Sequence, residues 1–308
     1  MSDTVFAPWT EDDRSLWGHV PQTLRHNLHR HELFTREALA DLISRYPRSR
    51  YSLIHMGAQG ERRFWKEGDI GGLSGAQVID WIENGRLWIN LREVNEVDPR
   101  YAAVLDRAYA EIESNAGIQS TFNRNMGILI SSPRAQVYYH CDLFGQALWQ
   151  ISGRKRVYVY PNHPPFLTQS QLEDIAVFGV EVDLAYKPAF ENYARCLELE
   201  AGQMAHWPLN GPHRVENLDM LNVSVTTEHM TSWILRRHRA LLANGLMRHR
   251  FGVAFSGTET AGPAYWTKAL AQGVLRRGRW LASKRAAKRL IEFKLDARRI
   301  GGVTDWAA

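Results

Sequence analysis

The sequence predicts a mixed α+β protein whose centre is built of β-strands and whose two ends are largely helical. Three observations support this prediction. Capped amphipathic segments alternate with short β-rich runs before residue 120, and short alternating runs bounded by Gly and Pro fill residues 121–230. After residue 230, apolar residues recur at helical spacing among many basic ones. We therefore divide the chain into residues 1–120, 121–230 and 231–308.

Residues 1–120 are expected to form an α/β support for the central strands. Thr35 is a typical N-cap residue, and Leu39 and Ile43 follow it at helical spacing. Asp98-Pro99 begins another helix, since proline is favoured in a first helical turn. The expected helices cover residues 35–46 and 74–84 and continue from residue 98, and the expected strands cover residues 50–56 and 87–91.

Residues 121–230 contain the strands of the predicted central unit. Pro133 and Pro161 each end a run, because proline cannot donate a hydrogen bond to a strand ladder. Residues 161–196 are too long for a hairpin and are interpreted as an insertion, serving either substrate recognition or as a structural cover. The expected strands cover residues 126–132, 136–140, 146–149, 156–160, 197–202 and 221–227.

His140, Asp142 and His213 are the candidate metal ligands and catalytic centre. Residues two apart on a strand share a face, so His140 and Asp142 are expected to reach one ion while Cys141 points away as a small buried residue. His213, from a distant strand, would complete a two-histidine, one-carboxylate set typical of iron, with open coordination positions. His206 is an alternative third ligand, but its odd spacing of seven residues from His213 and its position directly before Trp207-Pro208 favour His213.

The spacing around these residues extends the motif into two blocks. Gln146 and Gly153 give H-x-D-x3-Q-x6-G, and Gly202, Pro208 and Asn217 give G-x5-P-x4-H-x3-N. The blocks resemble the paired motifs of the cupin superfamily, in which each block is two strands joined by a tight turn in one small barrel. The resemblance implies a double-stranded β-helix (jelly-roll, cupin) barrel over residues 121–230.

The chain departs from the general cupin pattern at three positions, and two of these departures, at Asp142 and Gln146, make it similar to the Jumonji-C-like branch. Arg134 replaces the usual glycine, Asp142 the usual second histidine and Gln146 the usual glutamate. This resemblance implies an Fe(II)- and 2-oxoglutarate-dependent oxygenase. In the ungapped run 140–156, which is similar to the corresponding run of an asparaginyl hydroxylase of that branch, Lys155 falls on the lysine that holds 2-oxoglutarate.

Lys155 is also the expected cosubstrate anchor on chemical grounds. An enzyme that chelates a keto acid must hold its far carboxylate, and a lysine ammonium inside a barrel is a suitable point charge. The alternative interpretation is that Arg154-Lys155-Arg156 forms a solvated turn. Tyr138 and Asn222 are further candidates for cosubstrate contacts, with a barrel-wall aromatic as the alternative for Tyr138.

The charge of the chain is unevenly distributed. Residues 233–300 hold 16 Lys or Arg and three acidic residues, whereas residues 1–232 hold 22 basic and 29 acidic residues. Three interpretations of this basic helical region compete: packing on the acidic body or homodimer formation, binding to an anionic membrane surface, and contact with nucleic acid. Packing or a homodimer is preferred, because it also accounts for the acidic body.

The predicted function is that of an Fe(II)/2-oxoglutarate dioxygenase that hydroxylates an unidentified protein side chain or small molecule. The alternatives are a non-catalytic cupin-like regulatory or binding module whose basic tail contacts nucleic acid, and a cupin enzyme that uses a metal without 2-oxoglutarate. The expected location is the cytoplasm, since the chain has two cysteines, no signal-like start and no apolar run of eighteen residues.

Overall fold

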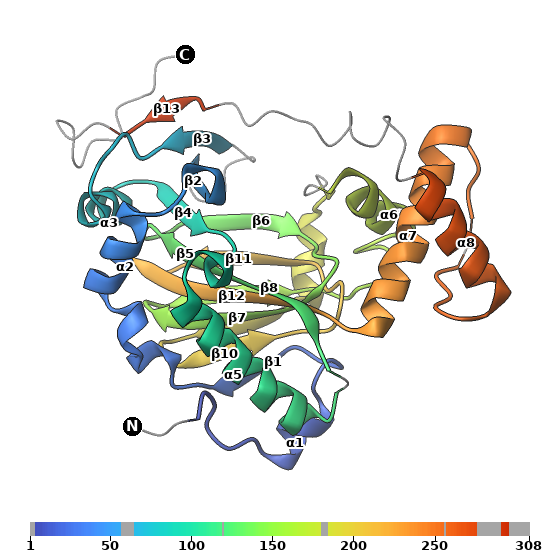
Figure 1. Ribbon diagram of the computed structural model, residues 1–308, viewed down its shortest axis with the longest axis horizontal. Helices are drawn as coiled ribbons and strands as arrows, with labels where there is room; N and C mark the ends of the chain where they lie inside the picture. Colours follow the sequence, from blue (N-terminus) through green and yellow to red (C-terminus); the bar gives the residue numbers. More distant parts are fainter. Residues whose placement is uncertain are drawn as a thin grey trace.

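Two β-sheets form the centre of the protein (Figure 1). The computed structural model describes residues 4–56, 65–118, 120–179, 184–255, 257–275 and 291–295. The strands are β1 (Gln22–Arg25), β2 (Tyr51–Met56), β3 (Trp65–Asp69), β4 (Leu87–Leu91), β5 (Phe122–Ser131), β6 (Gln136–His140), β7 (Gly145–Ser152), β8 (Lys155–Val159), β9 (Arg195–Leu199), β10 (Gln203–His206), β11 (His213–Asn217), β12 (Asn222–Met230) and β13 (Phe293–Lys294).

The larger sheet has nine strands in the order β1-β10-β7-β12-β5-β4-β2-β3-β13, and the smaller has the order β6-β11-β8-β9. The strands predicted from alternation are confirmed, but β5 begins earlier than expected, at Phe122, and β9 ends at Leu199, so the expected strand does not continue to residue 202. β1, β3 and β10 were not predicted. Short strands of this kind are stabilised by their partners in the sheet, and their sequences carry little signal of their own.

The helices predicted to start at residues 35, 74 and 98 begin at those capping residues, and the structure contains further helices. The helices are α1 (Glu11–Ser15), α2 (Arg36–Ser44), α3 (Gly75–Asn84), α4 (Val94–Val97), α5 (Pro99–Ala116), α6 (Gln169–Phe178), α7 (Ser232–Phe251) and α8 (Gly262–Leu275). The Thr35 hydroxyl accepts a hydrogen bond from the Ala38 amide at the start of α2, and Ser74 caps α3 with Gln77. The helices expected from residues 35, 74 and 98 are therefore confirmed.

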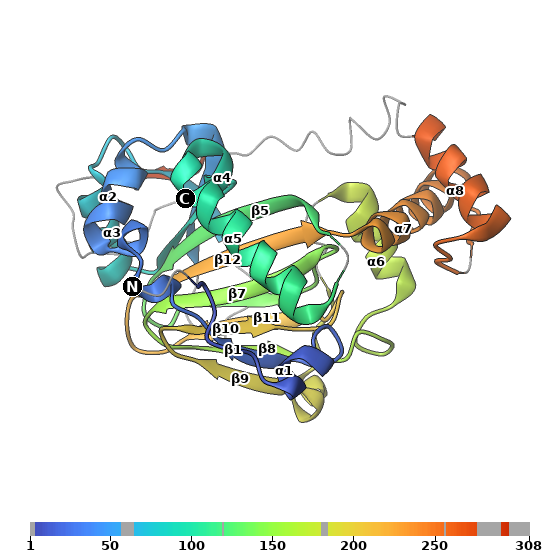
Figure 2. The same cartoon turned by 60° about the horizontal axis from the view of Figure 1, so that its bottom comes forward.

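The N-terminal helices cover one face of the nine-stranded sheet, and the four-stranded sheet faces the other (Figure 2). Leu39 of α2 and Leu105 of α5 lie in one apolar cluster with Ile128 and Trp149 of the larger sheet. A separate apolar cluster joins the two sheets; its members include Leu148, Val157, Leu199, Ala205 and Val215. This arrangement confirms the mixed α/β architecture with large sheets.

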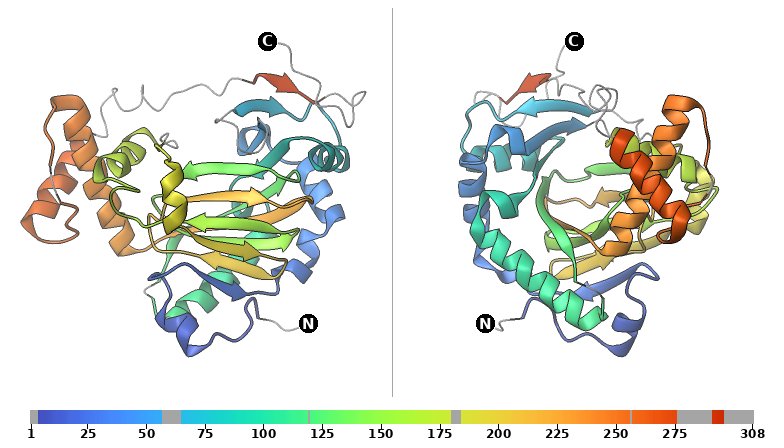
Figure 3. Two further views of the ribbon diagram at one scale, coloured as in Figure 1. Left: turned by 180° about the vertical axis from the view of Figure 1, so that it is seen from behind. Right: turned by 45° about the vertical axis from the view of Figure 1, so that its right-hand side comes forward.

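The insertion and the C-terminal helices pack together at one end of the sheets (Figures 1 and 3). The insertion contains α6 and a 3-10 helix, η4 (Pro188–Tyr193), and α6 packs along α7. Leu172 and Ile175 of α6 lie in one apolar cluster with Leu242 and Leu246 of α7. Among the described residues, no helix combines the length and hydropathy needed to span a membrane.

The C-terminal region departs in part from the expected helical structure. Residues 276–290, which include many of the basic residues of this region, lie outside the described residues. Beyond them, Phe293–Lys294 pairs in parallel with β3, so the helical interpretation is wrong there. The cause is long-range, because Phe293 packs its ring on Gly68, where an added Cβ would lie 2.2 Å from the ring.

Candidate metal centre

The structure brings His140, Asp142 and His213 together at one end of the four-stranded sheet. β6 and β11 pair so that His140 lies directly opposite His213. Oδ2 of Asp142 is 3.4 Å from Nε2 of His213 and 3.8 Å from Nε2 of His140. Among the described residues, no other set of three His, Cys, Asp or Glu side chains gathers its ligand atoms in this way.

Asp142 reaches this position by a different route from the one expected. β6 ends at His140, so Asp142 lies in the following loop and not on the strand. Strand alternation is therefore the wrong explanation for its convergence with His140. Cys141 behaves as predicted: it is buried in an apolar cluster, and its Sγ donates to the carbonyl of Asn210 at 3.4 Å.

Both histidine rings are oriented by backbone carbonyls. Nδ1 of His140 donates to the carbonyl of Tyr138 at 2.7 Å, and Nδ1 of His213 donates to that of Gly211 at 3.0 Å. Each ring is thereby held in the tautomer that leaves Nε2 free to accept a metal ion. Burial is the main cause that holds the pKa of His213 well below its usual value, and the charge of the neighbouring His140 is the second. The His213 ring is therefore neutral, as metal ligation requires.

His206 lies elsewhere and is not part of this group. It is on β10 in the larger sheet, where its ring stacks on Trp17 with centroids 3.6 Å apart. Its Nδ1 donates to the carbonyl of Gln146 at 2.8 Å, and burial lowers its pKa to about 3. His206 is therefore a core histidine.

Lys155 is buried at the start of β8, with 3% of its surface exposed. Its strand pairs with β11, where Lys155 lies opposite Asn217 and Val159 lies opposite His213. Alternation along both strands puts Lys155 on the same face of the sheet as His213. The interpretation of this residue as part of a solvated turn is wrong. Arg154 and Arg156 are more exposed and pair with Glu198.

The Lys155 ammonium has no hydrogen bond or ion pair to any residue in the described part of the chain. Burial lowers its pKa to about 7. A buried cation without a partner is strongly disfavoured, so the site is suited to an anionic ligand. The turn before Lys155 needs Gly153, whose φ is +81° and whose Cα faces Asn222 closely.

The other two predicted cosubstrate residues lie on different sheets, Tyr138 on the four-stranded sheet and Asn222 on the nine-stranded sheet. Tyr138 is two residues before His140 on β6, with its ring near that of Trp65, and its hydroxyl accepts a hydrogen bond from Gln136. Asn222 is fully buried, accepting a hydrogen bond from Gln150 at 2.7 Å and donating one to the carbonyl of Met220.

Asn217, the last residue of the second motif block, is buried. It lies at the far end of β11 from His213, so it does not fix the turn that orients this histidine. Its side chain instead donates to Ser131 Oγ and to the carbonyl of Ser132, both at 2.8 Å. Asn217 thus connects the four-stranded sheet to β5 of the larger sheet.

A cavity of about 330 Å³ opens beside Asp142. Its walls come from β12, which contributes Glu228, from α7, which contributes His238, and from α6, which contributes Ile175 and Ala176. Among its other lining residues are Leu143, Phe144 and Gln146. The insertion therefore forms a wall of the cavity beside the candidate metal centre.

Glu228 is a polar residue of this cavity that motif reasoning missed. Its carboxylate accepts a hydrogen bond from Gln146 at 3.3 Å, and its pKa is raised by burial and then by the charge of Asp142. The sequence carried a signal for it. Asn222, Ser224 and Glu228 fall at even spacings along one strand and therefore share a face.

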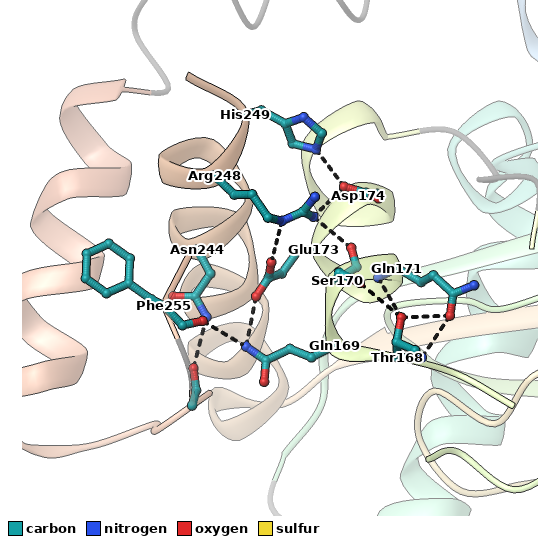
Figure 4. Close-up of polar contacts among 11 residues, drawn as sticks. Thr168, Gln169, Ser170, Gln171, Glu173, Asp174, Asn244, Arg248, His249 and Phe255 are labelled. Atoms are coloured by element: carbon teal, nitrogen blue, oxygen red, sulfur yellow. Dashed lines mark hydrogen bonds and ion pairs between the residues drawn. The ribbon is translucent and has the colours of Figure 1, made fainter. Parts of the chain in front are cut away.

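Polar contacts hold α6 against α7 (Figure 4). Arg248 of α7 lies between Glu173 and Asp174 of α6, with its Nε 3.1 Å from Oε2 of Glu173. His249 contacts the same Asp174 at 2.6 Å, and Gln169 donates to Glu173 at 2.8 Å. These contacts fix the insertion helix as a wall of the cavity.

Comparisons with known proteins identify the fold. Neither a family model nor a curated protein matches the sequence. Among solved structures, YcfD, a ribosomal oxygenase from Escherichia coli in complex with cobalt and 2-oxoglutarate, is similar with a TM-score of 0.50 and 15% identity over 93% of this chain and 73% of that chain. A second structure of Escherichia coli ribosomal oxygenase YcfD matches with a TM-score of 0.50 and 14% identity over 92% and 71%. The chain shares the fold of these proteins.

Proposed function

We propose that the protein is an Fe(II)- and 2-oxoglutarate-dependent oxygenase that hydroxylates a protein side chain or a small molecule. The observation that carries the proposal is the convergence of His140, Asp142 and His213 beside the sheet face that also holds the buried Lys155. The solved relative with cobalt and 2-oxoglutarate supports it, because a protein of this fold holds such a pair.

Different residues would bind the metal and the cosubstrate. His140, Asp142 and His213 would hold Fe(II) on one side, which leaves coordination positions for 2-oxoglutarate and dioxygen. Lys155 would pair with the far carboxylate of 2-oxoglutarate, and Tyr138 and Asn222 would line the same site. When bound, iron would activate dioxygen, the oxidant: one oxygen atom would enter a C–H bond of the substrate, and the other would enter succinate as 2-oxoglutarate is oxidised to succinate and carbon dioxide.

The protein's own contribution is positioning and exclusion of water. The cavity between Asp142, Glu228 and α6 offers the substrate a place beside the metal ligands, with apolar walls from Phe144 and Ile175. We infer that the two sheets enclose this site as the jelly-roll barrel expected over residues 121–230, with residues 1–120 as its support. The apolar cluster between the sheets supports this inference.

The test is a succinate assay on the purified protein with Fe(II) and 2-oxoglutarate. We expect slow uncoupled turnover by the wild type, and its reduction to the metal-free background in His140→Ala and Asp142→Ala. His163→Ala is the matched control, since His163 is exposed, and it should turn over like the wild type. Absence of succinate above the metal-free control, together with no 2-oxoglutarate binding by calorimetry, would reject the proposal.

A further inference from the structure

Asn210 is a buried polar residue in the segment that leads from β10 to β11, three residues before His213. It is 5% exposed and has a left-handed backbone, with φ of +60°. Asparagine is among the few residues that adopt this conformation readily. A turn closed by the Gly211 amide and the carbonyl of Pro208 holds it in place.

The side chain of Asn210 connects the segments that carry two candidate metal ligands. Its Nδ2 donates to the backbone carbonyl of Asp142 at 2.8 Å, and the backbone carbonyl of Asn210 accepts from Cys141 Sγ. The next residue, Gly211, accepts the hydrogen bond that orients the His213 ring. One short segment therefore fixes the loop of Asp142 and the ring of His213 relative to each other.

Arg237 of α7 determines which way the Asn210 amide points. Its Nε donates to Oδ1 of Asn210 at 3.4 Å, and another guanidinium nitrogen donates to Thr258 Oγ1 at 3.0 Å. A guanidinium can only donate, so Oδ1 must face Arg237 and Nδ2 must face the carbonyl of Asp142. Through Arg237 and Asn210, α7 is thus connected to the loop that carries Asp142.

We propose that Asn210 is a positioning residue that holds Asp142 against the two histidines, and that Arg237 orients its amide. This inference rests on the proposed function, because it requires that the three side chains bind a divalent metal. Asn210 itself touches neither metal nor substrate. Hydrogen-bonding partners of metal-site groups typically change metal affinity by about 10- to 100-fold when they are removed.

The experiment is a titration of the metal-free protein with Co(II), followed by the visible absorption of the bound ion. We expect Asn210→Ala to bind Co(II) about 10- to 100-fold more weakly than the wild type. Asn210→Asp preserves the shape and the contact with Arg237, but it replaces the donor with an acceptor, so it should weaken Co(II) binding as well. Arg237→Met should lose part of the affinity, and Arg237→Lys should retain more of it.

Asn244→Ala separates positioning from general destabilisation. Asn244 is equally buried, and its Nδ2 donates to a backbone carbonyl, that of Gly257, at 2.9 Å. Its loss should lower thermal stability to a similar degree. It should leave Co(II) affinity within about twofold of the wild type, since substitutions at separate sites with no shared partners usually have independent effects. A merely structural role for Asn210 would give the same result for both variants.

The outcomes distinguish this inference from the proposed function. Wild-type affinity for Co(II) in Asn210→Ala overturns the positioning role alone, and the metal centre stands. Failure of the wild-type protein itself to bind Co(II) overturns both. If the Asn210 variants do not fold, the two Arg237 variants decide the question, because equal affinity in Arg237→Met and the wild type also overturns the inference.

Discussion

At the scale of single residues, Lys155 shows where the protein requires a ligand. A buried ammonium loses its hydration, and among the described residues no carboxylate compensates it. This is unfavourable for the ligand-free protein. The far carboxylate of 2-oxoglutarate would offset that cost. A residue that is needed for function but destabilises the ligand-free protein is expected at a functional site.

Replacing Lys155 with methionine should stabilise the ligand-free protein and abolish 2-oxoglutarate binding. Burial lowers the pKa of Lys155 from 10.5 to about 7. The unfolded chain therefore binds this proton more tightly, so wild-type stability should rise between pH 7 and 10.5. The gain in Lys155→Met should be largest below pH 7, amounting to several kcal/mol at about 1.4 kcal/mol per pKa unit, and should shrink as the pH rises.

Urea unfolding at pH 6 and pH 9 measures this effect, and calorimetry measures 2-oxoglutarate affinity. Lys187→Met is the control, since Lys187 is exposed and its replacement should change stability by less than about 0.5 kcal/mol. A Lys155→Met protein that gains no stability at pH 6, or that binds 2-oxoglutarate normally, contradicts the assigned role.

The sequence predicted the residue types of the site better than their geometry. His140, Asp142 and His213 could be found because ligand chemistry restricts residue type and spacing. The position of Asp142 beyond the end of its strand could not be found, because the strand end depends on pairing with β11. Asn210 was also missed, since its role comes from a contact between segments 68 residues apart.

At the scale of elements, the predictions succeeded where the signal is local. Thr35, Ser74 and Asp98 cap their helices through contacts within three residues, which a sequence displays directly. The same signal exists for α6, where Thr168 and Gln171 form a capping box, and it was overlooked. β10 was missed because its sequence has few β-favouring residues and its partners, β1 and β7, are distant in sequence.

The same substitution at two helical glycines should have opposite effects. Gly245 of α7 faces α6, where an added Cβ would lie 2.6 Å from Val177 and 2.8 Å from the carbonyl of Glu173. Gly245→Ala should therefore destabilise the protein by about 1–3 kcal/mol and displace the cavity wall. Gly273→Ala in α8 meets no atom of the described residues within 4 Å and should stabilise by up to about 1 kcal/mol.

Thermal unfolding of both alanine variants checks this pair. Gly273→Ala also controls for the intrinsic gain in helix propensity, which is common to both sites. Equal stability changes in the two variants would show that the close approach of α6 and α7 is not rigid. The proposed role of α6 as a fixed cavity wall would then lose its support.

At the scale of the whole molecule, the C-terminal region connects two opposite sides of the protein. α7 and α8 lie beside the insertion, whereas β13 lies at the outer edge of the larger sheet, next to β3 (Figures 1 and 3). The amides of Glu292 and Leu295 donate to carbonyls of the β3 strand at 2.8 and 3.0 Å. This region was interpreted from its charge. Charge could not reveal a strand pairing that depends on the missing side chain of Gly68, which leaves room for the ring of Phe293.

Removing the ring of Phe293 should therefore weaken the fold far from the candidate metal centre. Phe293 is 4% exposed and fills the space above Gly68, so Phe293→Ala should cost about 3–5 kcal/mol in the free energy of unfolding. Ile291, two residues earlier, is 40% exposed, and Ile291→Ala should change stability by less than about 0.5 kcal/mol. Urea denaturation at constant pH compares the two variants with the wild type. If Phe293→Ala costs no more than Ile291→Ala, the C-terminal strand adds nothing to the stability of the sheet, and the connection across the molecule is incidental.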